Sequence, residues 1–330
     1  MKRRTVLALA PALPIVFRRA AAAQPAAGPA AGFDRPLRMV IPFAAGGSND
    51  IVGRVIAEGM GARLGQNVVV ENRGGAGGVP ANELVARAAK DGATFLLGGS
   101  GSFLISSLVQ PRVPYDIIRD FAPIGFVGNA PNVVTVHPGV AAGTMAELRD
   151  LARRSRPPLS YASPGVGTTG HLLGALLSQT FGAEMEHVPY RGTGPALTDV
   201  LAGRVQILTN AAAPLRPHVA SGGLRAVAVA APRRLALLPD VPTTVEGGFP
   251  DVVSSTWYGL LAPAGTPPGR IAALHRALGA TLGDAAVAAR LADEGVELEP
   301  SAAPEDFGRL LLDERRRWQA VVARANIRAE

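Results

Sequence analysis

The sequence predicts an α/β protein built from two similar lobes, and three observations support that prediction. From Leu37 onward, short runs rich in Val, Ile and Leu alternate with amphipathic helical patterns, which is typical of parallel strands covered by helices on both faces. A Pro-rich passage at 111–138 interrupts this alternation, which then restarts. Each half also carries its own glycine-rich loop between a strand and a helix, at 44–47 and at 165–170.

The first half contains strand–helix units in close succession. A buried strand is expected at 37–43, and a turn leads from it into an amphipathic helix at 51–65. A second strand at 67–72 precedes a helix near 80–89, and a third strand follows at 94–99. The pattern therefore predicts a parallel sheet in the first lobe.

The second half begins with a helix start signal. Thr144 and Glu147 form the T-x-x-E pattern of a capping box, which opens a helix that runs to about Arg154. A further helix is expected to carry Pro195 near its first turn. The other expected elements are strands at 159–163, 185–190, 205–210 and 224–230 and a helix at 171–181.

The remaining segments predict how the lobes are joined. Residues 125–137 and 252–265 fall where the chain is expected to cross between lobes. Amphipathic C-terminal helices should return to the first lobe, and they are expected at roughly 267–282, 284–294 and 304–325. We therefore predict that lobe 1 comprises residues 36–128 plus 250–330 and that lobe 2 comprises residues 129–249.

The N-terminus has the pattern of an export signal. A basic start at 2–4 precedes an apolar run at 6–17 and an Ala-rich stretch, so residues 1–23 are predicted to be a signal peptide that directs the protein to the periplasm. The apolar run is too short to span a bilayer. The twin arginines resemble a Tat signal, but Arg18 and Arg19 after the apolar run leave the Sec route open.

Charge and composition exclude several classes of function. Removing residues 1–23 removes five basic residues and no acidic ones, so the formal charge falls from +7 to +2 and gives no reason to expect nucleic-acid binding. No later segment runs for 18 apolar residues. The chain has no cysteine, which excludes disulfides, thiol catalysis and thiolate metal sites.

Residues 165–170 contain a G-x-G-x-x-G pattern between an expected strand and an expected helix, as a dinucleotide-binding loop does. Two features disfavour that interpretation. Pro164 lies inside the turn, and the acidic residue expected at the end of the next strand is misplaced, because Glu184 and Glu186 come before or at its start. We therefore expect no nucleotide cofactor.

The same loop suits a smaller anion. Glycines leave backbone N–H groups free at a helix N-terminus, where the helix dipole favours negative charge. The hydrogen-bonding side chains there carry no fixed positive charge, and they are Ser163, Thr168, Thr169 and His171. This end of the helix is thus expected to bind a small carboxylate. Alternatively, the two threonines only cap the helix and His171 lies on the surface; the helix end should favour its neutral form.

The first lobe repeats this design. Ala44 to Gly47 form the turn, Ser48 or Asn49 caps the following helix, and Asp50 lies in its first turn. The alternative is purely structural, with Ser48 only an N-cap and Asp50 paired with Arg54 at the i+4 position.

Other chemistry has little support in the sequence. The five histidines show no metal-binding spacing, and no pair of carboxylates stands out for acid–base catalysis. A G-x-S-x-G pattern fails at 98–102 because Ser102 occupies the place of the last glycine. No nucleophile–base pair is evident, and neither a metal nor a cofactor is expected.

Taken together, the motifs resemble one family. The chain contains, in order, PFAAGGSND, VVVENRGGAGG, DFAPIGFV, LSYASPGVGTTGH, HVPYRGTGPALTDVLAGRV, LPDVPTT and TWYGLLAPAGTP. These strongly resemble the Bug-type substrate-binding proteins of tripartite tricarboxylate transporters, over about residues 36–326. The resemblance implies a periplasmic binding protein type II fold with two lobes around a central cleft. It also implies capture of dicarboxylates, amino acids or aromatic acids by backbone amides, hydroxyls and ordered waters.

Carried over by position, the resemblance implies ligand contacts from both lobes. The expected ligand-binding residues are Phe43, Ala44, Gly46, Gly47, Ser48, Asn49, Asp50, Ser100, Ser102, Ser163, Gly167, Thr168, Thr169, His171 and Asn210. The chain departs from the family where a polar loop often follows the strand end at Thr209 and Asn210, because it has three alanines at 211–213. That departure makes a less polar ligand plausible.

The resemblance implies a monomer that delivers a small organic carboxylate to membrane permease subunits. Two alternatives stay open. The protein is a ligand-sensing partner of a signalling protein, or, with less support, an exported NAD-dependent or hydrolytic enzyme.

Overall fold

The structure is a computed structural model, and it describes residues 32–325 except 44, 47, 111 and 191. The predicted signal peptide at 1–23 lies outside the described residues, as do Ala44 and Gly47 of the first glycine loop. No helix in the described part of the chain is long and apolar enough to cross a membrane.

Lobe 1, as we use the term for the structure, is the part of the chain around a mixed sheet. Its strands are β1 (Leu37–Ile41), β2 (Val68–Asn72), β3 (Thr94–Gly99), β4 (Phe121–Val136), β9 (Ser255–Pro263) and β10 (Glu297–Leu298). The order is β2-β1-β3-β9-β4, with β10 beside β4. The first three strands are parallel, whereas β9 is antiparallel to both β3 and β4. β9 runs against its neighbours because it returns from the other lobe, and the short strand β10 is antiparallel to β4 as well.

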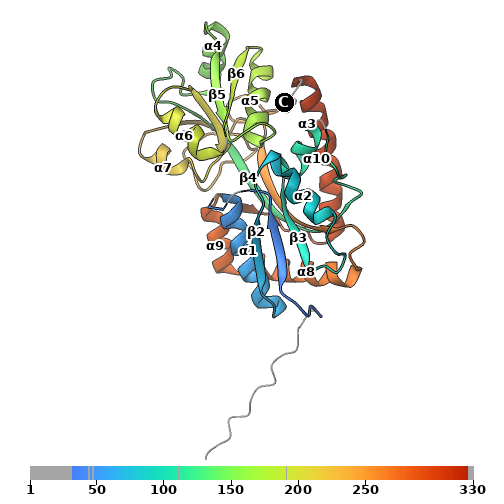
Figure 1. Cartoon of the computed structure of the whole chain (residues 1–330). Helices are drawn as coiled ribbons and strands as arrows, with labels where there is room; N and C mark the ends of the chain where they lie inside the picture. The colour runs from blue at the N-terminus through green and yellow to red at the C-terminus, as the bar shows by residue number, and fades with distance from the viewer. Residues whose placement is uncertain (1–31, 44, 47, 111, 191, 326–330) are drawn as a thin grey trace, which may run out of the picture.

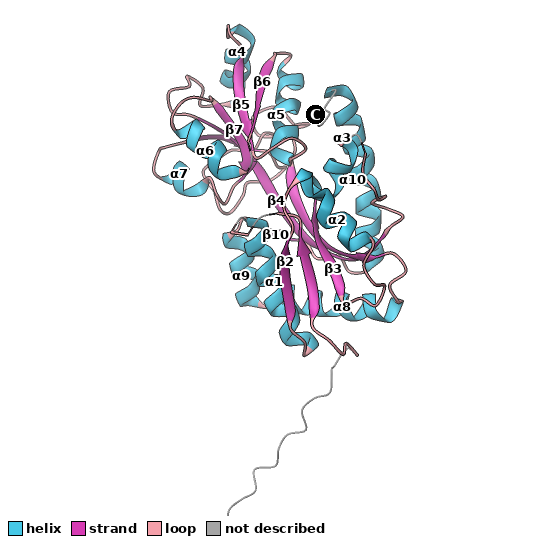
Figure 2. Ribbon diagram, viewed as in Figure 1, coloured by secondary structure: helices cyan, strands magenta, loops and turns pink. Residues whose placement is uncertain are grey.

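Lobe 2 surrounds a second sheet that shares β4. Its other strands are β5 (Leu159–Ser163), β6 (Met185–Pro189), β7 (Ile207–Ala211) and β8 (Arg225–Val229). β5 is parallel to both β6 and β7, and β4 is antiparallel to β7 and β8. Figures 1 and 2 show the two lobes as separate bodies, with the long strand β4 passing from one to the other.

Two chain crossings join the lobes. Up to Pro131, β4 pairs with β9; it pairs with β7 from Asn132 and with β8 from Val133. The return crossing precedes β9, where the N–H of Asn132 donates to the carbonyl of Ser254 and the N–H of Ser254 donates to that of Ala230. The boundaries 128/129 and 249/250 proposed above for the lobes remain a prediction.

Helices cover both sheets. In lobe 1 they are α1 (Ser48–Leu64), α2 (Val79–Ala86), α8 (Pro268–Leu282), α9 (Ala285–Asp293) and α10 (Pro304–Ala325), with shorter turns at η1 (Ala76–Gly78), η2 (Ser100–Ile105) and α3 (Ser106–Val109). In lobe 2 they are α4 (Met145–Arg154), α5 (Thr169–Phe181), α6 (Thr193–Leu201) and α7 (Arg216–Ala220). The predicted capping box is present, since the N–H of Glu147 donates to Thr144 Oγ1 at 3.2 Å and the N–H of Thr144 donates to the Glu147 carboxylate at 3.1 Å.

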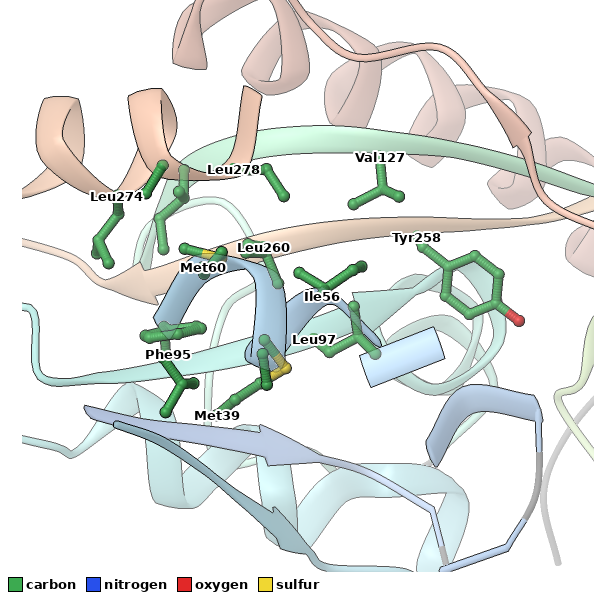
Figure 3. Close-up of a cluster of buried hydrophobic side chains, with 14 of the residues drawn as sticks. Met39, Ile56, Met60, Phe95, Leu97, Val127, Tyr258, Leu260, Leu274 and Leu278 are labelled. Atoms are coloured by element: carbon green, nitrogen blue, oxygen red, sulfur yellow. The ribbon is translucent and has the colours of Figure 1, made fainter. Parts of the chain in front are cut away.

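The core of lobe 1 explains why the C-terminal helices return to it. Met39, Ile56, Phe95, Leu260 and Leu274 come from β1, α1, β3, β9 and α8, and all are buried in one cluster (Figure 3). Each such side chain contributes about 1.5–3 kcal/mol to folding when it is fully buried. Segments more than 200 residues apart in the chain therefore form a single core.

A second cluster links the two lobes. Leu172 on α5 of lobe 2 is buried together with Phe103, Trp257 and Trp318 of lobe 1. The last of these residues lies on α10, which packs against both β4 and α5. The start of α5, which the predicted anion site requires, is thus held against lobe 1.

Candidate ligand-binding site

The glycines of the G-x-G-x-x-G pattern are explained by backbone geometry. Gly165 and Gly167 have φ values of 147° and 78°, which side-chain-bearing residues rarely adopt. At Gly170, a Cβ would lie 2.2 Å from the carbonyl oxygen of Thr209, so glycine allows α5 to approach β7. The pattern is therefore accounted for without a nucleotide.

Ser163 organises this loop from beneath. Its hydroxyl is fully buried, accepts from the N–H of Gly165 at 3.2 Å and contacts the carbonyl of the same residue at 3.1 Å. It also lies 2.8 Å from Nε2 of His187, so the chain does contain a Ser–His pair, contrary to the expectation from sequence. Because the hydroxyl has no exposure and already bonds to the loop, this pair holds the loop's shape and offers no nucleophile to a substrate.

Two histidines stack under the loop. The rings of His171 and His187 are 3.8 Å apart between centroids and 6° from parallel, and Tyr161 stacks on the far side of His187 at 4.9 Å. His171 Nδ1 accepts a hydrogen bond from the N–H of Gly167 at 3.2 Å, which requires an unprotonated nitrogen. Burial lowers the pKa of His171 to about 4, and burial together with the His171 charge lowers the pKa of His187 to about 3.

His171 is therefore a buried residue and not a surface one, since its exposed fraction is 7%. The neutral form that we expected from the helix end is favoured here, and burial is the main cause. His187 was not among the site residues predicted from the sequence. A single histidine on a strand gives no sign in the sequence that it supports a neighbouring loop.

The two threonines at the start of α5 have partners within the chain. Thr168 is the N-cap: its Oγ1 accepts from the N–H of His171 at 3.2 Å and donates to the carbonyl of Gly165 at 2.8 Å. Thr169 Oγ1 lies 2.7 Å from Oγ1 of Thr256 on β9. The amides of the first turn, at Thr169 and Gly170, have no acceptor within the helix, as at any helix start. These two backbone amides are the hydrogen-bond donors that the loop can offer to a ligand.

Asp50 supports the first-lobe loop. Its carboxylate accepts from the N–H of Gly46 at 2.9 Å, from Nε of Arg54 at 3.0 Å and from Nδ2 of Asn72 at 3.0 Å. Burial would raise the pKa of Asp50, but these hydrogen bonds outweigh it and the pKa lies below its usual value. The expected pairing with Arg54 is confirmed. We interpret Asp50 as a residue that holds Gly46 of the first-lobe loop in place.

The serines after β3 are buried. Ser100 Oγ donates to the carbonyl of Ser255 at 3.2 Å and accepts from the N–H of Trp257 at 3.1 Å, so it ties β3 to the crossing strand. The hydroxyl of Ser102 is buried and has no hydrogen-bond partner among the described residues. Both belong to η2, a π-helical turn that follows β3.

Asn210, the second-lobe candidate on β7, lies near the end of that strand. Its Nδ2 donates to Thr193 Oγ1 at 2.9 Å, which joins the end of β7 to the start of α6. Thr209 Oγ1 donates to the carbonyl of Gly170 at 2.7 Å. The remaining candidates, Phe43, Ser48 and Asn49, are partly exposed.

The structure brings η2, which carries the candidates Ser100 and Ser102, against the loop that carries Gly167 to Thr169, at the carboxyl ends of β3 and β5. A Cβ on Gly101 of η2 would lie 3.6 Å from the carbonyl oxygen of Gly167 and 3.8 Å from the amide nitrogen of Thr169. Ligands of open α/β sheets bind at the carboxyl ends of strands. By contrast, a surface hollow lined by Arg35, Leu37 and Thr94 lies at the opposite, amino-terminal edge of the lobe 1 sheet. Within residues 32–325, as far as they are described, no group of His, Asp and Glu is arranged to hold a metal ion.

Two α/β lobes joined by crossing strands, with the loop at the start of α5 in lobe 2 facing η2 of lobe 1, define a two-lobed solute-binding protein. The chain belongs to the tripartite tricarboxylate transporter family of receptors, whose model matches residues 52–327. The family places it among the binding proteins of transporters and not among enzymes.

Solved structures of relatives agree with this assignment. The periplasmic binding protein BugD is 33% identical, with a TM-score of 0.79 that covers 90% of this chain and 100% of BugD. An R. palustris protein solved with adipate is 31% identical, with a TM-score of 0.81 over 89% of this chain and 98% of its own. MatC from Rhodopseudomonas palustris, solved with malate, is 31% identical, with a TM-score of 0.78 over 88% of this chain and 99% of MatC. The predicted Bug-type resemblance and the two-lobed binding-protein fold are confirmed.

Proposed function

We propose that this chain captures a small organic carboxylate between its lobes and delivers it to the permease subunits of a tripartite transporter. The observation that carries this proposal is the start of α5. The loop at 163–168 is held by Ser163, His171 and Thr168, and it presents first-turn amides without any fixed positive charge. Such a site suits one carboxylate better than a polyphosphate, because the several charges of a polyphosphate are better matched by cationic side chains.

The relatives that were solved with adipate and with malate support the ligand class. The candidate residues from Phe43 to Asn210 are proposed to form the site, most of them by shaping the two loops and fewer by direct contact. The protein is further proposed to act as a monomer in the periplasm, exported by the signal at 1–23, as its basic and apolar N-terminal pattern suggests.

Ligand binding is tested first on the purified protein. Native mass spectrometry should detect a co-purified organic acid. A panel of dicarboxylates, tricarboxylates, amino acids and aromatic acids should contain a compound that raises the thermal midpoint. A ligand at 100 times its dissociation constant adds about 2.7 kcal/mol to the free energy of unfolding. NADH, FAD and ATP serve as controls and should change nothing; a shift with a nucleotide and with no acid would contradict the proposal.

The transport role is tested separately. Membrane vesicles that carry the permease subunits should take up the labelled acid only when this protein is added. Binding without stimulated uptake would leave a sensing role as the better interpretation.

A further inference from the structure

A cluster of four hydrogen-bonded polar side chains lies where the two chain crossings meet the start of α5. They are Asn132 on β4, Ser254 on the return crossing, Thr256 near the start of β9 and Thr169, the first residue of α5. Asn132, Ser254 and Thr169 are buried, and Thr256 is partly exposed. Of the four, only Thr169 was predicted from the sequence to belong to the site.

Two short side-chain contacts each join a pair of these segments. Asn132 Nδ2 donates to Ser254 Oγ at 2.8 Å, and so links the two crossings, which the backbone bond from the N–H of Asn132 to the carbonyl of Ser254 joins as well. Oγ1 of Thr169 lies 2.7 Å from Oγ1 of Thr256, which links α5 of lobe 2 to β9 of lobe 1.

Two longer contacts connect the pairs to each other. Thr169 Oγ1 donates to Asn132 Oδ1 at 3.4 Å, and Ser254 Oγ donates to the carbonyl of Thr169 at 3.5 Å. The Thr169 hydroxyl has one proton, so when it donates to Asn132 it accepts from the Thr256 hydroxyl. Each of the four side chains therefore has a partner within one buried network, and a satisfied buried network holds its segments rigidly.

The network ends at the backbone group that is proposed to receive the ligand. Thr169 carries one of the first-turn N–H groups of α5, and both its hydroxyl and its carbonyl belong to the network. A binding group is most effective when the residues behind it fix its orientation. On the basis of the proposed function, we propose that Asn132 is a positioning residue: it anchors the start of α5 to both chain crossings and so orients the Thr169 amide toward a carboxylate.

Titration calorimetry of Asn132→Leu tests this role. Leucine has a similar volume and removes both side-chain hydrogen bonds of Asn132. The probe is whichever of adipate, malate, citrate, glutamate and benzoate binds the wild type most tightly. Asn132→Leu should weaken its binding about tenfold, which lies within the range of interaction energies in a shared hydrogen-bond network.

Ser254→Ala is a second, smaller change in the same network. It removes the acceptor of Asn132 Nδ2 and the donor to the carbonyl of Thr169. It should weaken binding of the same acid about threefold. If Asn132→Leu does not fold, as judged by circular dichroism and thermal unfolding, the result for Ser254→Ala decides.

Thr135→Val is the matched control. Thr135 lies on the same strand, is fully buried like Asn132, and donates from Oγ1 to the carbonyl of Leu208 at 2.9 Å. Thr135→Val therefore removes a buried hydrogen bond outside the network. It should lower the free energy of unfolding and leave the affinity for the acid unchanged. A purely structural role for Asn132 predicts the same result for Asn132→Leu.

A double-mutant cycle shows whether Asn132 acts through Thr169. Thr169→Val lacks the hydroxyl that bonds to Asn132 Oδ1. In that background, Asn132→Leu should weaken binding by less than about threefold instead of about tenfold. An undiminished loss would show that Asn132 affects the ligand by another route, and the inference would be wrong.

The outcomes separate this inference from the proposed function. If the wild type binds an acid and its affinity is unchanged in Asn132→Leu and in Ser254→Ala, the inference is wrong while carboxylate capture stands. If none of the five acids binds to the wild type, the proposed function fails and the inference fails with it.

Discussion

His171 and His187 lie face to face beneath the glycine loop, with ring centroids 3.8 Å apart and planes 6° from parallel. Two protonated rings at this distance would repel each other in a buried site. The geometry is therefore compatible only with a stack in which at least one ring is neutral. Since His171 Nδ1 accepts from the N–H of Gly167, protonation at that atom would also remove a hydrogen bond that shapes the loop.

The first prediction is a loss of stability in mild acid. Both folded pKa values, about 4 for His171 and about 3 for His187, lie below the ordinary value of 6.5. As the pH falls below 6.5, the unfolded chain takes up protons before the folded chain does, so the free energy of unfolding decreases between pH 6.5 and about 3. Each unit of difference in pKa corresponds to about 1.4 kcal/mol.

Urea unfolding at a series of pH values measures this slope. His187→Phe keeps a flat ring between Tyr161 and His171 but cannot bind a proton, so its slope should be shallower. His218→Asn changes a histidine on α7, outside the stack, and should retain the wild-type slope. A wild-type slope in His187→Phe would show that the stack does not titrate as described.

The histidine stack also shows what the sequence could and could not predict. The longer strands and helices lie within a few residues of their predicted bounds, because apolar periodicity is a local property of the chain. The short helical segments η2, α3 and α7 were not predicted. The contact between Ser163 and His187 joins residues 24 apart on neighbouring strands, and no local pattern marks it. The same holds for Leu172, which packs into a core of lobe 1 although it belongs to lobe 2.

For the candidate site, the sequence predicted the loops better than the roles of their side chains. Hydroxyls and a carboxylate next to glycines were expected to contact a ligand. In the structure Ser100, Thr168 and Asp50 bond to the chain itself. A hydrogen-bonding side chain at a helix start can satisfy the loop or a ligand, and only the three-dimensional partners distinguish these roles.

The second prediction compares two helical glycines. In α5, a Cβ on Gly174 would lie 2.0 Å from the Tyr161 ring, which is itself buried against His187. Gly174→Ala should therefore lower the free energy of unfolding by about 1–3 kcal/mol through overpacking. In α8, Gly279 is exposed and a Cβ there would meet nothing within 4 Å. Gly279→Ala should instead raise the free energy of unfolding by about 0.5–1 kcal/mol. Similar effects of the two substitutions in denaturant unfolding would contradict the packing described for Tyr161.

The third prediction concerns Asp50. Its carboxylate is buried and accepts three hydrogen bonds, one of them from Arg54. Asp50→Asn should lower the free energy of unfolding by about 1–3 kcal/mol, because the donors on Gly46, Arg54 and Asn72 lose their charged acceptor. The exposed pair of Glu58 and Arg290 offers a control, and Glu58→Gln should cost less than about 1 kcal/mol. If Asp50→Asn were as mild as Glu58→Gln, Asp50 would not be holding the loop.

The last prediction isolates the backbone amide that is proposed to bind the ligand. Thr169 is the first residue of α5, where proline is well tolerated because its φ fits the helix and the missing N–H has no helical acceptor. Thr168 before it is extended, with ψ at 159°, as a residue that precedes proline requires. Thr169→Pro thus removes one donor from the start of α5 while the helix is retained.

Proline also removes the side-chain contact between Thr169 and Thr256, so Thr169→Val is the matched control. Valine lacks the hydroxyl but keeps the amide. A hydrogen bond to a charged group contributes about 1.5–3 kcal/mol, so Thr169→Pro should weaken binding of the best carboxylate at least about tenfold relative to Thr169→Val. Calorimetric titration of both variants provides the comparison, and their unfolding curves report any damage to the fold. Equal affinities in the two variants would mean that the carboxylate does not lie at the start of α5, and the site would then have to be sought at the first-lobe loop before α1.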